Sequence, residues 1–270
     1  MPIFVNDNHV ESLIFNGGEC HVCVYAPNVY YITEVYAELD NSDDIMTLLL
    51  TVDAVRRIYP TASIRLTIPY FPYARQDRVC NPGEALSIKV MADLINSLRC
   101  DSVTIFDPHS DVTPALINNC VVKSIVDIIA YSPVINEKIV HEELILVSPD
   151  AGAEKKVRQL AKLMQKRVIC ATKERDTKTG EIISTHVCQD VENENLIIID
   201  DICDGGRTFL ELAKYLKKFG ANDIYLYVTH GIFSKGMEQF KKLFKHIYCY
   251  HVLNDLYTSD EFLTVLKEMT

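Results

Sequence analysis

The chain has 270 residues, 48% of them hydrophobic and 24% charged, and its net charge is −10. This composition is typical of a soluble globular protein with one large domain or two small ones. The acidic balance, without a long Lys/Arg run, argues against nucleic-acid partners and anionic membranes. No apolar run approaches the roughly 20 residues of a membrane span, so no membrane partner is expected.

Nine cysteines are scattered along the chain without a framework. The N-terminus has no basic stretch followed by an apolar one, so we expect reduced thiols and a cytoplasmic location. Cys20 and Cys23 form a C-x-x-C pair, but they lie in an alternating stretch typical of a strand. Residues three apart in a strand face opposite sides, so a zinc site is not expected there.

Strand and helix patterns alternate along the chain, which predicts an α/β fold with a largely parallel sheet. In order, we expect a helix from Ser42, a strand over 64–68, a helix over 84–98, strands over 103–106 and 144–147, a helix after Gly152, strands over 168–171 and 196–201, a helix over 208–219 and a strand over 224–229.

The first half of the chain repeats in the second at the level of pattern. Helix 84–98, strand 103–106 and His109 correspond to helix 208–219, strand 224–228 and His230. A duplicated α/β unit explains this correspondence. We therefore expect two similar domains, 1–130 and 131–270.

Carboxylates follow several of the predicted strands: Asp107, Asp150, Asp200 and Asp201. The carboxyl ends of parallel strands line one crevice, which is where ligands bind in such sheets. The alternative is that each carboxylate only caps the helix that follows it.

The segment 197–209 is the most informative in the chain. Three isoleucines run into Asp200 and Asp201, a Gly pair and Thr208 follow, and an amphipathic helix begins. Free backbone N–H groups and the positive end of the helix dipole favour phosphate at such a turn. The adjacent carboxylates suit sugar hydroxyls or Mg²⁺. The segment therefore predicts a sugar-phosphate site.

Two further segments carry clustered polar side chains. The first, 72–78, contains Arg75, Gln76 and Asp77, which suit phosphate oxygens and a base edge. The second, 172–180, is a polar run predicted to be a mobile surface loop, and its Lys173 and Arg175 could neutralise a transferring phosphoryl group. Solvated charged loops remain the alternative for both.

These segments resemble one family in order and spacing. "PYFPYARQDR", "FDPHS", "VSPDAG", "ATKERD" and "IIIDDICDGGRT" are similar to successive motifs of the ribose-phosphate diphosphokinases, across residues 13–250. The resemblance implies two phosphoribosyltransferase-type domains, each a mostly parallel sheet flanked by helices. It also implies Mg²⁺-dependent transfer of the diphosphoryl group of ATP to the C1 hydroxyl of a ribose 5-phosphate moiety, releasing AMP.

The resemblance also assigns roles to single residues. The ATP-binding set would be Phe15, Glu19, Arg75, Gln76, Asp77 and His109. Lys173, Arg175 and His109 would be catalytic, the first two on a flap. His109 would lie beside the ATP phosphates and Mg²⁺, and Asp150 near a second metal and the diphosphate. Asp200 and Asp201 would hold the ribose hydroxyls, and the acceptor phosphate would be cradled by Asp204, Gly205, Gly206, Arg207 and Thr208.

The hairpin around Phe15 and Glu19 resembles one that reaches the adenine of a neighbouring subunit. The resemblance therefore implies a homo-oligomer with a shared ATP site.

The phosphate turn departs from the family pattern. Asp204–Thr208 lacks one hydroxyl and contains Arg207, which either binds phosphate oxygens or points to solvent. The acceptor is therefore either ribose 5-phosphate or the larger ADP-ribose, and the product would feed nucleotide or NAD synthesis. The alternatives are a phosphoribosyltransferase that consumes the activated sugar and a non-catalytic regulatory homologue.

Overall fold

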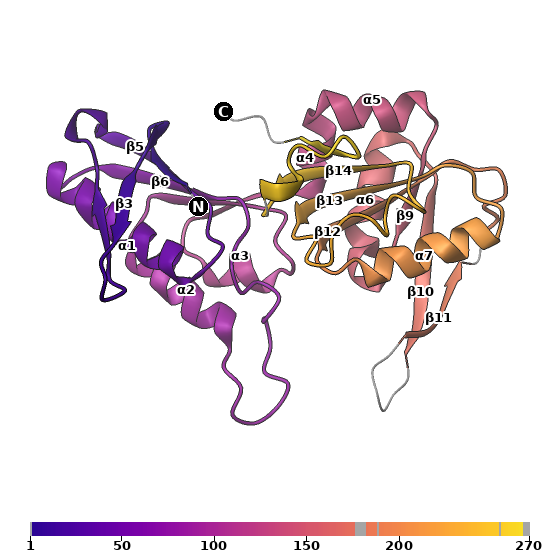
Figure 1. The fold of residues 1–270 in the computed structure, drawn as a ribbon, viewed down its shortest axis with the longest axis horizontal. Helices are drawn as coiled ribbons and strands as arrows, with labels where there is room; N and C mark the ends of the chain where they lie inside the picture. Colours follow the sequence, from indigo (N-terminus) through magenta and orange to yellow (C-terminus); the bar gives the residue numbers. More distant parts are fainter. Residues whose placement is uncertain (1, 176–181, 188, 254, 267–270) are drawn as a thin grey trace. The chain divides into compact units, whose positions relative to one another are not determined.

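The computed structural model describes residues 2–175, 182–187, 189–253 and 255–266. The chain divides into two compact units, Met1–Ser124 and Ile125–Thr270 (Figure 1). The domain boundary expected from the sequence, 130/131, falls at the end of helix α4 (Ile125–Tyr131), which belongs to the second unit.

Unit 1 is built on a six-stranded sheet with the order β2-β1-β5-β6-β7-β8. Its parallel strands are β5 (Ile32–Ala37), β6 (Ser63–Ile68), β7 (Ser102–Phe106) and β8 (Cys120–Lys123). Strands β1 (Ile3–Val5) and β2 (Asn8–His9) pair antiparallel at one edge. The helices are α1 (Ser42–Ile58), α2 (Ser87–Ser97) and α3 (Val112–Leu116), and strands β3 (Glu11–Ile14) and β4 (Cys20–Cys23) form a separate hairpin.

The start of α1 was predicted correctly, whereas α2 begins three residues later than expected. The Asn41 side chain caps α1 by accepting from the N–H groups of Asp43 and Asp44. The Asp44 carboxylate in turn accepts from the Asn41 N–H. Before α2, the carboxylate of Glu84 accepts from the N–H groups of Cys80 and Asn81. Glu84 therefore closes a turn and does not begin the helix.

Unit 2 is built on a seven-stranded sheet with the order β11-β10-β9-β12-β13-β14-β15. Its strands are β9 (Ile145–Ser148), β10 (Val168–Arg175), β11 (Ile182–Val187), β12 (Leu196–Cys203), β13 (Ile224–Gly231), β14 (His246–Val252) and β15 (Leu263–Val265). All neighbours are parallel except β10 and β11. Its helices are α4, α5 (Pro133–His141), α6 (Ala151–Met164) and α7 (Arg207–Lys218), and short 3-10 turns η1 (Ala26–Asn28) and η2 (Asp255–Tyr257) occur in units 1 and 2. The expected α/β fold with two mostly parallel sheets is confirmed.

The repeat predicted from the sequence is visible in both sheets. Parallel neighbours β6 and β7 are joined through α2, and parallel neighbours β12 and β13 are joined through α7. The two histidines do not correspond in position. His109 is exposed in the loop after β7, whereas His230 lies inside β13 and is buried.

The prediction of a surface loop over 172–180 is wrong for its first residues. Strand β10 continues to Arg175 and pairs antiparallel with β11, with Lys173 opposite Thr185. Only 168–170 of this strand pair with β9, so the β10–β11 ribbon extends beyond the parallel sheet (Figure 1). Residues 176–180 lie outside the described part of the chain.

Each unit has its own hydrophobic core, which packs against its own sheet. Every residue of β9 and β13 is buried, as expected for parallel strands covered on both faces. Cys20 and Cys23 lie in strand β4, as expected. In the described part of the chain, no three His, Cys, Asp or Glu side chains form a ready metal cluster, and no helix is long and apolar enough to cross a membrane.

Candidate functional site

The carboxyl edge of the unit 2 sheet carries most of the predicted acceptor residues. Strands β9 and β12 are parallel neighbours. Asp150 follows the first, and Asp200 and Asp201 lie in the last half of the second. Strand β13, on the other side of β12, ends at the segment 231–236. The topology therefore places these groups at one edge of the unit 2 sheet. Asp107, which the sequence grouped with the other carboxylates, follows strand β7 of the unit 1 sheet instead.

The carboxylates at this edge are close enough to change one another's ionisation. Burial raises the pKa of Asp200 well above its ordinary value, and the charges of Asp201 and Asp150 raise it further. The Asp201 N–H, which donates to Asp200 Oδ1 at 2.9 Å, opposes this shift. Asp201 itself is 8% exposed. Such mutually repelling carboxylates are typical of a site that takes a cation or donor hydroxyls.

The two interpretations of these carboxylates are both partly right. Asp150 caps α6, accepting from the N–H groups of Gly152 at 3.0 Å and Ala153 at 3.2 Å, and its charge also acts on Asp200. The N-cap of α7 (Arg207–Lys218) is Gly206, so neither Asp200 nor Asp201 stands at the N-cap position of that helix. The capping alternative therefore accounts for Asp150 in part, and it does not place the Asp pair at a helix N-cap.

Replacing Asp200 with asparagine should stabilise unit 2 at neutral pH. A raised native pKa means that the native state holds a proton that the unfolded state releases above about pH 4, so stability falls as pH rises through the interval between the two pKa values. Asparagine carries no charge and keeps the oxygen that accepts from the Asp201 N–H. We expect a gain of about 1 kcal/mol in the free energy of unfolding at pH 7.

Denaturant unfolding in EDTA between pH 4 and 8 measures this gain. The difference between the variant and the unmodified chain should grow with pH and then level off. Asp190→Asn is the control, because Asp190 is an exposed carboxylate of the same unit. A pH-independent difference, or a loss of stability at pH 7, would contradict the electrostatic account.

The turn between β12 and α7 is shaped by residues from later in the chain. Gly206 has φ +73°, and a Cβ there would lie 2.1 Å from Cζ of the buried Phe240 ring. Gly205 has more room, since a Cβ there would meet Cδ of Lys235 at 3.4 Å. The backbone of the turn is therefore fixed from behind by an aromatic ring and flanked by a lysine.

The polar side chains of the turn have different partners. Asp204 Oδ1 accepts from the Ser234 hydroxyl at 2.6 Å, which ties the turn to the segment after β13. The Nε of Arg207 donates to Glu211 Oε1 at 2.7 Å, one helical turn along α7. Thr208 is half-buried in the first turn of α7. Arg207 is therefore exposed but already paired within its own helix.

Lys173 and Arg175 lie on the β10–β11 ribbon. Strand β10 is parallel to β9, so the ribbon leaves the sheet at the same edge that carries Asp150 and Asp200. The two residues are two positions apart on one strand, although the register with β11 shifts between Glu174 and Arg175. Their side chains lie outside the described part, and their catalytic roles stay predictions.

The carboxyl edge of the unit 1 sheet carries a second polar cluster. Burial alone would raise the pKa of Asp77, but hydrogen bonds from Ser110 and Arg78, together with the charges of Arg78 and His109, bring that pKa below its ordinary value. The Arg78 Nε lies 3.0 Å from Asp77 Oδ1. The loops after the neighbouring strands β6 and β7 therefore meet, and they bring Asp77 near Ser110 and His109.

A strained backbone marks the same edge. Asp107, the residue after β7, has φ +36° and is 2% exposed, and Tyr73 in the loop after β6 has φ +62°. Non-glycine residues in the left-handed region cost free energy and concentrate at functional sites. Arg75 and Gln76, predicted to bind ATP, are both exposed in this loop.

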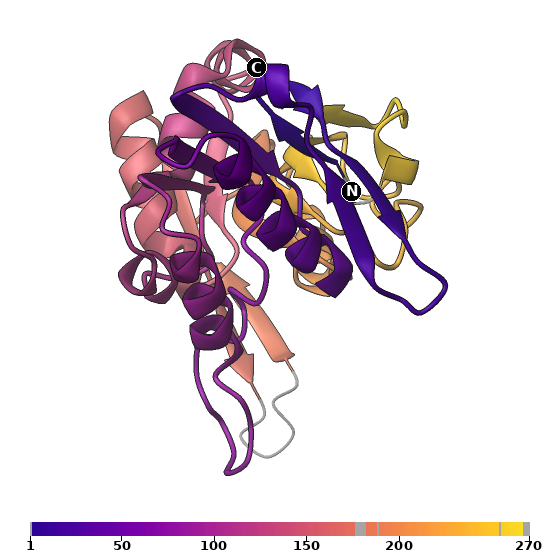
Figure 2. The same cartoon turned by 90° about the vertical axis from the view of Figure 1, so that its left-hand side faces the viewer.

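Phe15 and Glu19 are not brought to this cluster. They flank the turn of the β3–β4 hairpin, where the Phe15 N–H donates to the Glu19 carbonyl at 2.8 Å, and both are exposed. The hairpin and the loop between β6 and α2 lie apart within unit 1 in both views (Figures 1 and 2). One chain alone therefore does not assemble the full predicted ATP-binding set.

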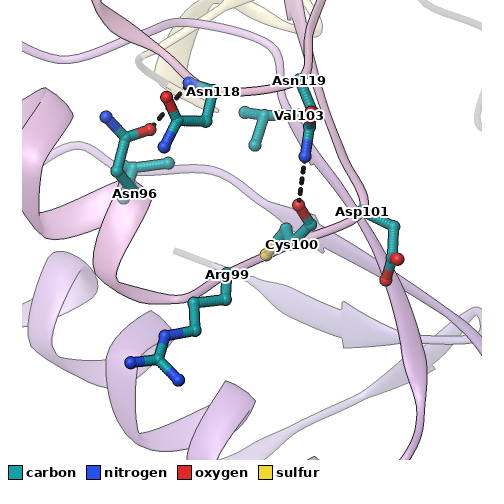
Figure 3. A pocket seen from close by; sticks show the side chains of 8 residues that line it. Asn96, Arg99, Cys100, Asp101, Val103, Asn118 and Asn119 are labelled. Atoms are coloured by element: carbon teal, nitrogen blue, oxygen red, sulfur yellow. Dashed lines mark hydrogen bonds between the residues drawn. The ribbon is translucent and has the colours of Figure 1, made fainter.

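A pocket of about 280 Å³ lies elsewhere in unit 1 (Figure 3). It is lined by residues around the end of α2 and the start of β7, among them Asn96, Arg99 and Asn119. The Asn119 amide donates to the Cys100 carbonyl, and the Asn118 N–H donates to Asn96 Oδ1 (Figure 3). This pocket is at the opposite end of β7 from His109, so it is separate from the polar cluster.

Several residues of these clusters were missed by the sequence analysis: Ser110, Ser234, Lys235 and Phe240. Ser110 follows His109 directly in the "FDPHS" motif, so the assignment of His109 to the site could have been extended to Ser110. The other three follow β13, and only the parallel pairing of β12 and β13 brings them to the turn. No local pattern in the sequence marks them.

Comparison with known proteins identifies relatives for both units. Residues 9–98 match the model of the N-terminal domain of ribose phosphate pyrophosphokinase, and residues 122–265 match that of the phosphoribosyl transferase domain. A ribose-phosphate pyrophosphokinase of Cereibacter sphaeroides is 34% identical over 87% of this chain and 69% of its own length. That of Marinomonas sp. is 32% identical over 74% of this chain and 64% of its own length.

A solved structure extends the comparison to the fold. The phosphoribosylpyrophosphate synthetase of Mycobacterium smegmatis matches 95% of this chain and 85% of its own with a TM-score of 0.77, at 23% identity. The chain spans only 61–64% of the length of the Marinomonas sp., Shewanella oneidensis and Hyphomonas neptunium relatives.

Proposed function

Because the chain belongs to the ribose-phosphate pyrophosphokinase family, we propose that it transfers the diphosphoryl group of ATP to the C1 hydroxyl of a ribose 5-phosphate moiety and releases AMP. The observation that carries this proposal is the carboxyl edge of unit 2. There the topology places Asp150, the Asp200–Asp201 pair, the turn before α7 and the β10–β11 ribbon together.

Each of these groups suits one part of an acceptor sugar phosphate. The Asp200 and Asp201 carboxylates accept hydrogen bonds from ribose hydroxyls, which fixes the C1 hydroxyl for attack on the β-phosphorus. The backbone N–H groups at the start of α7 receive the 5-phosphate. Lys173 and Arg175 offset the charge on the transferring phosphoryl oxygens. No nucleophilic side chain is needed.

The carboxylate set also suits Mg²⁺. The charge of Asp150 acts on Asp200, and a divalent cation between these groups and the substrate phosphates would relieve that repulsion. Mg²⁺ is usually held by one or two carboxylates, and substrate phosphate oxygens and water complete its shell. We propose His109 beside the Mg²⁺ that accompanies the ATP phosphates and Asp150 beside a second metal near the diphosphate. Such ions would neutralise phosphate charge when bound.

We propose that unit 1 binds ATP through Arg75, Gln76, Asp77 and His109. The hydrogen bonds on Asp77 keep it ionised, and its loop meets that of His109. The separation of the hairpin of Phe15 and Glu19 from this loop supports a homo-oligomer in which the hairpin serves the ATP site of another copy. Light scattering of the purified chain tests this.

Product identification tests the proposed function. The protein is incubated with ATP, Mg²⁺ and either ribose 5-phosphate or ADP-ribose, and AMP and the sugar product are quantified by mass. A diphosphate gained by either acceptor, with one AMP per product, supports the reaction. We include ADP-ribose because Arg207 is exposed at the turn, where a larger acceptor would reach its guanidinium. If neither acceptor gains a diphosphate and no AMP appears, the proposal is wrong.

The same assay separates the alternatives. A phosphoribosyltransferase consumes the activated sugar with a base and releases diphosphate without using ATP. A non-catalytic regulatory homologue binds nucleotides but forms neither AMP nor a sugar diphosphate.

A further inference from the structure

We propose that Lys235 is a phosphate-binding residue of the acceptor site, where its ammonium recognises the C5 phosphoester of the acceptor. This inference rests on the proposed function and adds a residue from outside the segment 204–208. The carrying observation is the position of the side chain. Its Cδ, Cε and Cγ atoms lie 3.4, 3.5 and 3.7 Å from the place where a Cβ on Gly205 would be.

The backbone around Lys235 is held in place on both sides. Before it, the N–H groups of Ile232 and Phe233 both donate to the Cys203 carbonyl, at 2.8 and 3.2 Å. The Ser234 hydroxyl donates to Asp204 Oδ1. After it, the Gly236 N–H donates to the Phe233 carbonyl at 2.9 Å, which closes the turn. The lysine is therefore presented to the turn by a fixed loop.

One strained residue and one close contact support the same conclusion. Phe233 is fully buried with φ +48°, and a Cβ on Gly231 would lie 2.2 Å from its ring. A non-glycine residue persists in this conformation only where its surroundings impose it. The segment 231–236 is thus a built turn that lies against the acceptor turn.

The charge of Lys235 has no evident structural use. The residue is exposed, and within the described residues no carboxylate lies at ion-pair distance from its ammonium. Arg207, by contrast, is paired with Glu211. In a chain of net charge −10, a cation beside a phosphate turn must be supplied locally. A lysine whose stem lies beside Gly205 supplies it.

Substitution by methionine tests the charge separately from the packing. Lys235→Met keeps an unbranched stem against Gly205, Lys235→Arg keeps the charge, and Lys242→Met is the control because Lys242 is an exposed lysine of the same region. We expect Lys235→Met to raise the KM for the phosphorylated acceptor about tenfold, with kcat and the KM for ATP changed less than twofold. Lys235→Arg should stay within about threefold of the unmodified chain.

Calorimetric titration makes the result independent of turnover. Ribose 5-phosphate, ADP-ribose and unphosphorylated ribose are titrated with Mg²⁺ present. Weaker binding of one or both phosphorylated sugars to Lys235→Met, with no change for ribose, supports the proposal and identifies the phosphoester as monoester or diphosphate. Equal affinities of Lys235→Met and the unmodified chain, or no binding by either, overturn it. Absent turnover with intact Lys235-dependent binding would instead overturn the proposed function alone.

Discussion

Replacing Gly206 with alanine should destabilise unit 2 by about 3 kcal/mol. Its φ of +73° costs an alanine about 1 kcal/mol, because the left-handed region crowds a Cβ. The new methyl group would also lie 2.1 Å from Phe240 Cζ, and such overpacking costs about 2 kcal/mol.

Phe240 cannot move aside easily. Its ring is 1% exposed and packs edge-to-face on Phe233, with centroids 6.0 Å apart, and at 5.8 Å on Phe244. The clash must therefore be relieved by shifting the turn itself, which would also displace the N–H groups at the start of α7. We expect acceptor binding to weaken together with stability.

The neighbouring glycine provides the matched control. Gly205→Ala introduces the same methyl group at ordinary contact distance from the flexible Lys235 stem, so we expect a cost below about 1 kcal/mol. Denaturant unfolding of both variants measures the difference. Equal stabilities would mean that Phe240 does not set the shape of the turn.

Replacing Lys173 with alanine should lower kcat by about 10²–10³ while leaving the fold intact. Removing one group that stabilises transition-state charge typically costs this much in enzymes. The backbone of Lys173 pairs with Thr185 in the ribbon, and alanine preserves that pairing. The KM values should change little, because the interaction is proposed to act in the transition state.

The control for this prediction is Lys162→Ala, on an exposed lysine of α6 in the same unit. AMP release and thermal unfolding are followed for both variants. A kcat of Lys173→Ala within about twofold of the unmodified chain would remove Lys173 from the mechanism.

The sequence predicted those parts of the fold whose causes are local. The apolar stripe of α1, the helix start at Ser42 and the isoleucine run of β12 are all short-range signals, and the corresponding elements lie where expected. The α/β alternation was enough for the two mostly parallel sheets.

The errors arose where the conformation of a polar segment depends on a partner outside that segment. Thr172 to Arg175 has the composition of a loop, but backbone pairing with β11 makes it a strand. Glu84 is a residue type that favours the start of a helix, but its carboxylate accepts from Cys80 and Asn81 and closes the preceding turn. Lys235 and Phe240 could not be assigned to the turn because only the β12–β13 pairing brings them there. In each case the deciding partner lies outside the segment itself.

The two glycines of the phosphate turn divide it into a position that can vary and one that cannot. Gly206 lies against Phe240 and is closed to any side chain, whereas Gly205, Arg207 and Lys235 border open or flexible surroundings. A mutant library aimed at a new acceptor should therefore randomise these three positions and keep 206 and 240 constant. Changes at these three positions should alter the surface of the turn while leaving the packing of Gly206 against Phe240 intact.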